Sequence, residues 1–112
     1  DLRFEAAAAS ELAENIKTHD TGLRVPAVDW NLTSRRVLTL DWVDGISLSD
    51  VEAIKSSGHD INLILAKAAT SLFLQIFKDG FFHADPHPGN LFLDKNGDLV
   101  LVDFGIMGRL DM

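Results

Sequence analysis

The loop from His83 to Asn90 concentrates side chains that can carry out acid–base and metal chemistry. It reads His-Ala-Asp-Pro-His-Pro-Gly-Asn, so two imidazoles, one carboxylate and one amide stand close together. Two prolines and a glycine restrict its backbone, and polar loops that a scaffold holds rigid often carry function. The alternative is an ordinary connection in which Asp85 and Asn90 bond to turn amides. The loop taken alone leaves both interpretations open.

A second acidic position, Asp103, begins the sequence Asp-Phe-Gly downstream of this loop. Protein kinases place a catalytic aspartate and a metal-binding asparagine five positions apart, continue into a hairpin, and then present another metal-binding aspartate before Phe-Gly. Asp85, Asn90 and Asp103 have this spacing. In such a site Asn90 and Asp103 bind Mg²⁺ against the triphosphate of ATP, and Asp85 orients the acceptor hydroxyl. The spacing therefore predicts an ATP-dependent phosphotransferase.

Glu5 is a candidate for the nucleotide-binding side of the same site. It lies in an alanine-rich stretch that favours a helix, and its spacing places it on one face with Ala9, Leu12 and Ile16. In kinases a helix carboxylate at this place pairs with the lysine that binds the α- and β-phosphates. The alternative is a solvated carboxylate in the first turn, which the helix dipole stabilises.

Three further residues are candidates for the adenine pocket. Asp41 and Val43 follow an expected strand where a kinase bends between its lobes, so their backbone groups are expected to pair with adenine. Phe92, two residues beyond Asn90, is expected at the floor of that pocket. The alternatives are the end of a strand for Asp41 and Val43 and a core position for Phe92.

The elements that must position these residues are expected in the order helix, two strands, two helices, polar loop and hairpin. The Asn-Gly pair at 96–97 is a strong hairpin signal, and the long apolar helix before the loop is expected to be buried as core. Lys67, Gln75, Lys78 and Asp79 interrupt that apolar stretch, which makes it poorly suited to span a membrane. The expected bounds are a helix at 1–17, paired strands at 23–27 and 36–42, a short helix capped by Ser49, a helix at 61–78 capped by Asp60 and ending at Gly80, and a hairpin at 91–93 and 99–102.

This order predicts the α+β class and a protein-kinase-like fold. Residues 1–43 would supply part of the small lobe and the hinge, and residues 44–112 part of the large lobe with the catalytic loop and metal-binding hairpin. The phosphate-binding lysine and the glycine-rich loop of a kinase do not precede Glu5 in this sequence. We therefore expect residues 1–112 to be a fragment of one kinase-like domain that is inactive alone.

Composition excludes several other classes of protein. The sequence contains no cysteine, which rules out disulfides, thiolate zinc sites and cysteine nucleophiles. A net charge of -7 argues against a nucleic-acid partner, because neutralising phosphates requires a clustered basic surface. The first residues show neither the basic nor the apolar region of a secretory signal.

The combined motifs resemble the UbiB family of atypical protein-kinase-like proteins, which is linked to ubiquinone biosynthesis. The resemblance covers essentially the whole chain and implies that Asp85 is the catalytic-loop aspartate, that Asn90 and Asp103 bind Mg²⁺, and that Glu5 partners the nucleotide-binding lysine. The matching stretches are Asp-Leu-Arg-x-Glu-Ala-Ala at the start, Arg-Val-Leu-Thr-Leu-x-Trp-Val-Asp-Gly at 36–45, the loop at 83–90, and Val-Asp-Phe-Gly-Ile-Met-Gly-Arg-Leu at 102–110.

The resemblance also implies cofactors, partners and a location. The cofactors would be ATP and Mg²⁺, and the partners a quinone-precursor lipid or quinone-synthesis proteins. The location would be the cytoplasmic face of the bacterial inner membrane, with membrane association through regions outside this sequence. His87 stands where ordinary kinases have a lysine near the transferred phosphate. A histidine supplies less fixed positive charge, which favours ATP hydrolysis or small-molecule phosphorylation over protein phosphorylation.

Two other functions stay open at the level of sequence. One is a nucleotide-binding scaffold that organises quinone-synthesis proteins without catalysis. The other is a metal-dependent hydrolase in which His83, Asp85 and His87 bind a transition metal, because alternating residues can converge from an extended backbone. The hydrolase leaves the spacing of Asn90 and Asp103 unexplained.

Overall fold

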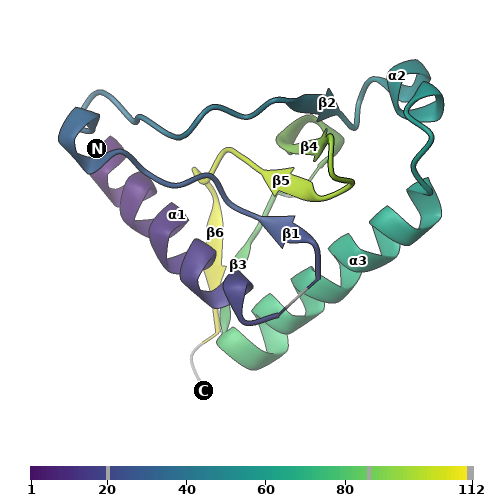
Figure 1. The fold of residues 1–112 in the computed structure, drawn as a ribbon. Helices are drawn as coiled ribbons and strands as arrows, with labels where there is room; N and C mark the ends of the chain where they lie inside the picture. Colours follow the sequence, from purple (N-terminus) through teal and green to yellow (C-terminus); the bar gives the residue numbers. More distant parts are fainter. Residues whose placement is uncertain (20, 86, 111–112) are drawn as a thin grey trace.

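The computed structural model describes residues 1–19, 21–85 and 87–110, and Figure 1 shows their arrangement. Helices and two small sheets alternate along the chain, which confirms the predicted α+β class. In chain order the elements are α1 (Leu2–Lys17), β1 (Leu23–Arg24), a 3₁₀ turn (Trp30–Leu32), β2 (Gly45–Ser47), α2 (Val51–Ser56), α3 (Ile61–Leu74), a π-helical turn (Gln75–Asp79), β3 (Phe81–His83), a 3₁₀ turn (Pro88–Asn90), β4 (Leu91–Asp94), β5 (Leu99–Leu101) and β6 (Met107–Arg109).

The predicted hairpin is the centre of the larger sheet. β4 and β5 pair antiparallel with Leu91 opposite Leu101, and the strand order is β1-β5-β4-β2. Gly97 has φ +84°, a left-handed conformation that glycine adopts without steric cost. Asp94 fixes the same turn, because its Oδ1 accepts hydrogen bonds from the backbone N–H of Asn96 at 2.9 Å and of Asp98 at 3.0 Å.

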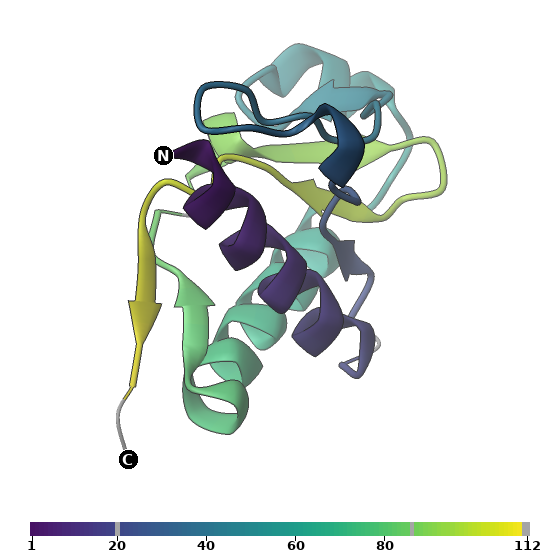
Figure 2. The same cartoon turned by 90° about the vertical axis from the view of Figure 1, so that its left-hand side faces the viewer.

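α1 covers this sheet through the face predicted from its spacing. Ala9, Leu12 and Ile16 are buried, and Asp1 caps the first turn by accepting a hydrogen bond from the Arg3 N–H. Figures 1 and 2 show α1 and α3 converging toward β3, where α1 packs against the π-helical turn. The main core joins residues of all three α-helices, both sheets and two connecting segments: Ala9, Leu12, Ile16, Leu23, Val25, Ile54, Ile64, Phe81, Leu91, Leu93, Leu99, Leu101 and Phe104.

The prediction of paired strands at 23–27 and 36–42 is wrong, because the paired regions are much shorter in the structure. β1 contains only Leu23–Arg24 and pairs parallel with β5, because Pro26 has no N–H with which to continue a ladder. The two segments do approach each other, through one bridge between Val28 and Leu40. Between them Asp29 caps a 3₁₀ turn instead of allowing a continuous strand.

The expectation that the long helix is buried is also wrong. Only Ile64 and Ser71 of α3 are buried, because one side of the helix packs on the sheet and the other has no partner within the described residues. In the most apolar window of Ile61–Asp79, 17% of the residues are buried. This segment is long and apolar enough to cross a membrane by length and composition alone. Core helices of soluble proteins meet the same criterion.

Two boundaries around the helices differ in detail from those expected. α2 is capped by Asp50, not by Ser49, because the Asp50 side chain accepts from the Ala53 N–H at 3.2 Å. Asp60 caps α3 as predicted, and the helical segment ends at Gly80, whose φ is +67°. Its last residues form a π-helical turn, which the sequence pattern did not predict.

A second ribbon, of β3 and β6, was not predicted. The two strands run antiparallel with Phe82 opposite Gly108, and Figure 2 shows them side by side at one edge of the molecule. Arg109 holds β6 in place, because its guanidinium contacts both Glu11 oxygens at 2.9 Å and lies 4.3 Å from the centre of the Phe81 ring. The ribbon brings the residues that follow Asp103 back alongside the strand that leads into the His83 loop.

Candidate active site

His83, at the end of β3, connects the two polar segments of the candidate site. Its side chain is 1% exposed, and its Nδ1 accepts a hydrogen bond from the backbone N–H of Asp85 at 3.0 Å. Its Nε2 bonds to the backbone carbonyl oxygen of Asp103. A neutral ring with its proton on Nε2 satisfies both contacts. His83 therefore joins the backbone of the loop to that of the Asp-Phe-Gly segment.

Asn90 brings the loop and the hairpin together at one end. Its Nδ2 donates to the backbone oxygen of Asp85 at 2.8 Å, and its own backbone oxygen accepts from the Val102 N–H at 2.9 Å. Because Leu91 faces Leu101 in the hairpin, Asn90 lies beside the residues that lead into Asp103. The structure thus brings Asp85, Asn90 and Asp103 to the same end of the hairpin.

Asp103 has the unusual backbone conformation of the site. Its φ is +62°, in the left-handed region, where it is the sole residue other than glycine among the described positions. Such a conformation costs on the order of 1–3 kcal/mol and persists when surrounding contacts hold it. The side chain is exposed, and its Oδ1 accepts from the Gly105 N–H at 3.3 Å. A carboxylate is therefore presented at the surface from a constrained backbone.

Glu5 reaches this segment from α1. Its Oε1 accepts a hydrogen bond from the backbone N–H of Phe104 at 3.1 Å. The N–H of Phe104 and the carbonyl of Asp103 belong to one peptide group, so Glu5 and His83 bind opposite ends of the same unit. Glu5 is half-buried and has no ion pair with a described residue. A surface hollow of about 420 Å³ adjoins Glu5 and Phe104.

His87 and Asp85 form the exposed part of the loop. The His87 Nδ1 accepts from the Gly89 N–H at 3.0 Å, which leaves Nε2 facing Asp85 at 3.7 Å from its Oδ2. Both side chains are about half exposed, at 53% and 46%, so this contact contributes little to stability. The arrangement leaves both groups accessible to a substrate.

The residues predicted for the adenine pocket lie on other segments. The N–H of Asp41 bonds to the Ala27 carbonyl at 2.9 Å, which leaves the carbonyl of Asp41 as the group that can pair with a base. Val43 follows in the extended segment before β2 and is half-buried. Phe92 lies in β4 between the buried Leu91 and Leu93, and so points to the opposite face of the sheet. Their part in nucleotide binding stays a prediction.

Transition-metal binding by the His-x-Asp-x-His loop does not fit this geometry. Both ring nitrogens of His83 are engaged with backbone groups, so this side chain offers no lone pair to a metal. Across the described ranges, no three histidine or acidic side chains form a cluster suited to a metal ion. The residues fit Mg²⁺ better, since Asn90 and Asp103 offer the hard amide and carboxylate oxygens that this ion prefers.

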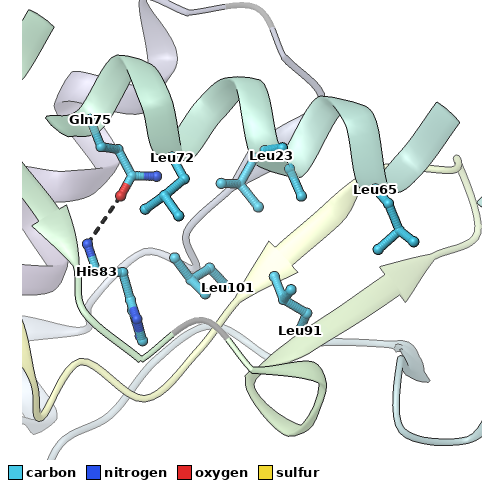
Figure 3. Close-up of a pocket in the computed structure, with 9 residues that line it drawn as sticks. Leu23, Leu65, Leu72, Gln75, His83, Leu91 and Leu101 are labelled. Carbon is cyan, nitrogen blue, oxygen red and sulfur yellow. Dashed lines mark hydrogen bonds between the residues drawn. The ribbon is translucent and has the colours of Figure 1, made fainter. Parts of the chain in front are cut away.

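Gln75 is a residue of this region that sequence reasoning missed. Its side chain is 1% exposed, and its Oε1 accepts from the backbone N–H of His83 at 3.0 Å, as Figure 3 shows. The available signal was an amide inside a largely apolar helical stretch, which we interpreted only as an interruption. A buried polar side chain requires partners, and those partners proved to be in the site.

Comparison with known proteins gives the family of the chain. The model of the family described as "ABC1 atypical kinase-like domain" matches residues 1–112 of this chain. The probable protein kinase UbiB of Marinobacter nauticus is 38% identical over 98% of this chain and 21% of its own length. The chloroplastic protein ACTIVITY OF BC1 COMPLEX KINASE 1 of Arabidopsis thaliana is 40% identical over 94% of this chain and 15% of its own.

A solved structure agrees with these relatives. The complex of Rv3197 with erythromycin from Mycobacterium tuberculosis has a TM-score of 0.75 and 26% identity, and the match covers 97% of this chain and 27% of that chain. The chain therefore spans about a fifth, 21%, of the length of the UbiB protein. These matches confirm the predicted kinase-like fold and the resemblance to UbiB proteins. The chain belongs to the ABC1 atypical kinase-like family.

Proposed function

We propose that this chain supplies the metal-binding and catalytic loops of a Mg²⁺-dependent atypical kinase or ATPase of the UbiB type. The supporting observation is the position of Asn90, whose side chain bonds to the Asp85 carbonyl while its backbone bonds to Val102, next to Asp103. One residue thereby joins the three positions predicted from spacing. Membership of a kinase-like family supports a nucleotide as the ligand.

In this proposal each residue has a defined part. Asn90 and Asp103 hold Mg²⁺, which when bound neutralises charge on the phosphates of ATP. Asp85 orients the attacking hydroxyl or water and accepts its proton, and the exposed His87 lies beside it. Glu5 and His83 fix the backbone on which Asp103 stands. Asp41, Val43 and Phe92 contact the adenine.

The biological setting is part of the proposal. The similarity to UbiB of Marinobacter nauticus supports a role in ubiquinone biosynthesis, with a quinone-precursor lipid or quinone-synthesis proteins as partners. The site would work at the cytoplasmic face of the bacterial inner membrane. The exposed imidazole of His87, in place of a fixed cation, favours ATP hydrolysis or small-molecule phosphorylation.

The test is nucleotide turnover by the full-length protein with and without Asp103→Asn. The wild-type protein should release phosphate from ATP only with Mg²⁺, and the variant should lose most of this turnover because an amide is a weaker Mg²⁺ ligand than a carboxylate. Undiminished Mg²⁺-dependent turnover in the variant would contradict the role of Asp103.

A further inference from the structure

We propose that Gln75 is a positioning residue for both polar loops of the site, acting through His83. This inference rests on the proposed function and adds to it a residue outside the kinase-like motifs. Gln75 is the first residue of the π-helical turn and lies eight positions before His83. It does not belong to the loop at 83–90 or to the Asp-Phe-Gly segment.

The contacts of Gln75 form a buried polar chain. Its Oε1 accepts from the His83 N–H at 3.0 Å, and its Nε2 donates to the Ser71 Oγ at 3.3 Å. Ser71 is 0% exposed and Gln75 is 1% exposed, so water does not compete for either bond. Because Ser71 lies one helical turn earlier in α3, the Gln75 amide is held in one orientation relative to that helix.

His83 transmits this position to two other residues. Its backbone is bonded to Gln75, and its ring is bonded to the Asp85 N–H and to the Asp103 carbonyl. A shift of the His83 backbone therefore moves a ring that contacts both the predicted catalytic aspartate and the predicted metal ligand. The bond from Gln75 to His83 thus helps to fix the position of the site relative to α3.

Among the described residues that line the adjoining cavity, no other side chain can replace Gln75 as the acceptor. Gln75 and His83 line an apolar cavity of about 210 Å³ between α3 and the hairpin, shown in Figure 3. The remaining residues that line it are all apolar: Leu23, Leu65, Ala68, Ala69, Leu72, Leu91 and Leu101. If the acceptor of Gln75 is removed, the His83 N–H faces leucine and alanine side chains. An unsatisfied buried N–H is unfavourable, so the backbone is expected to move.

The experiment compares two variants of the full-length protein with the wild type. Gln75→Met keeps the size of the side chain and removes its acceptor. Ile64→Val removes one methylene from a residue of α3 that is 4% exposed and lies outside the polar chain, so it controls for lost packing. Thermal unfolding shows that each protein is folded.

The measurement is the binding of the non-hydrolysable analogue AMP-PNP by calorimetry across a Mg²⁺ titration, followed by kcat for ATP. Gln75→Met should require several-fold more Mg²⁺ for half-maximal binding. Its kcat should fall about tenfold to a hundredfold, since a misplacement of about 1 Å in catalytic groups has effects of this size. Ile64→Val should keep a Mg²⁺ requirement close to that of the wild type.

Mg²⁺-dependent binding of AMP-PNP by the wild-type protein tests the proposed function. The Mg²⁺ requirement of each variant relative to that of the wild type tests the inference. If wild-type protein binds AMP-PNP with Mg²⁺ but Gln75→Met has the same Mg²⁺ requirement, the inference fails and the proposed function stands. An equal rise in the Mg²⁺ requirement of Gln75→Met and Ile64→Val would also overturn the inference, because lost packing alone would then explain the effect. If Gln75→Met does not fold, Ser71→Ala takes its place, and an unchanged Mg²⁺ requirement there overturns the inference.

Discussion

The carboxylate of Glu5 bonds to the backbone N–H of Phe104, which lies 99 positions later in the chain. His83 bonds to the other end of the same peptide group, at the carbonyl of Asp103. The orientation of this peptide sets the direction of the Asp103 side chain. The position of α1 and the position of the predicted metal ligand are therefore coupled through one backbone unit.

Two substitutions of Glu5 should show whether ATP turnover depends on its hydrogen bond to Phe104 or on its negative charge. Glu5→Ala removes the acceptor for Phe104, and we expect a large fall in Mg²⁺-dependent ATP turnover. Glu5→Gln keeps an acceptor oxygen and should keep more activity than Glu5→Ala if the bond to Phe104 matters. Steady-state kinetics on the full-length protein measures both.

The matched control for Glu5 is Glu14→Ala on the same helix. Glu14 is 74% exposed at its side chain and pairs with Lys17 at 3.1 Å, so its loss should leave turnover unchanged. Equal activity of Glu5→Ala and Glu14→Ala would show that the contact with Phe104 has no role in turnover.

Asp85→Asn should separate catalysis from nucleotide binding. The side chain is 46% exposed, and the loop is held through the Asp85 backbone, so this substitution should leave the fold and AMP-PNP binding intact. We expect loss of ATP turnover and loss of complementation in a bacterial strain that lacks the protein. Complementation retained by a variant that binds nucleotide without turnover would favour the scaffold over the enzyme.

Asp94→Ala should destabilise the hairpin that carries the site. Asp94 is 6% exposed and accepts from the N–H groups of Asn96 and Asp98, while Arg24 lies 3.3 Å from its other oxygen. Loss of these bonds should lower the free energy of unfolding by about 1–3 kcal/mol, because two backbone N–H groups of the turn lose their acceptor. Chemical denaturation measures the change, and the exposed Asp44→Ala, with an effect within about 0.5 kcal/mol, is the control.

Gly97→Ala should destabilise the same hairpin for a different reason. Its φ of +84° is unfavourable for alanine, and an added Cβ would lie 3.1 Å from the His59 Nδ1. We expect a loss of about 1 kcal/mol or more in stability, measured by thermal unfolding. Gly58→Ala has a similar φ of +80° with open space around the added Cβ, so the difference between the two variants isolates the contact with His59.

Local signals allowed part of this structure to be predicted. The hairpin followed from Asn96-Gly97, and α1 from alanine content and the spacing of Leu12 and Ile16, because turn and helix preferences act over a few residues. The shared location of Asp85, Asn90 and Asp103 followed from their spacing around that hairpin. The extents of β1 and of the 36–42 segment could not be predicted from the sequence, since tertiary contacts decide how far a short strand continues.

Contacts made by backbone atoms account for most of what could not be predicted. β3 and β6 have three residues each, and their pairing leaves no alternation that a sequence pattern could reveal. His83 and Gln75 act on N–H and carbonyl groups, which every residue possesses, so their partners are not marked in the sequence. The exposure of α3 was missed because an apolar helix has the same composition whether or not it is covered.

The left-handed backbone at Asp103 also decides which substitutions there are informative. Asparagine shares with aspartate a tolerance for positive φ that alanine and the β-branched residues lack. Asp103→Ala would add backbone strain to the loss of a ligand, and its inactivity would be ambiguous. Asp103→Asn changes the ligand on an unaltered backbone. A library of substitutions at this position should accordingly show soluble protein for Asn and Gly and reduced yields for Val, Ile and Thr.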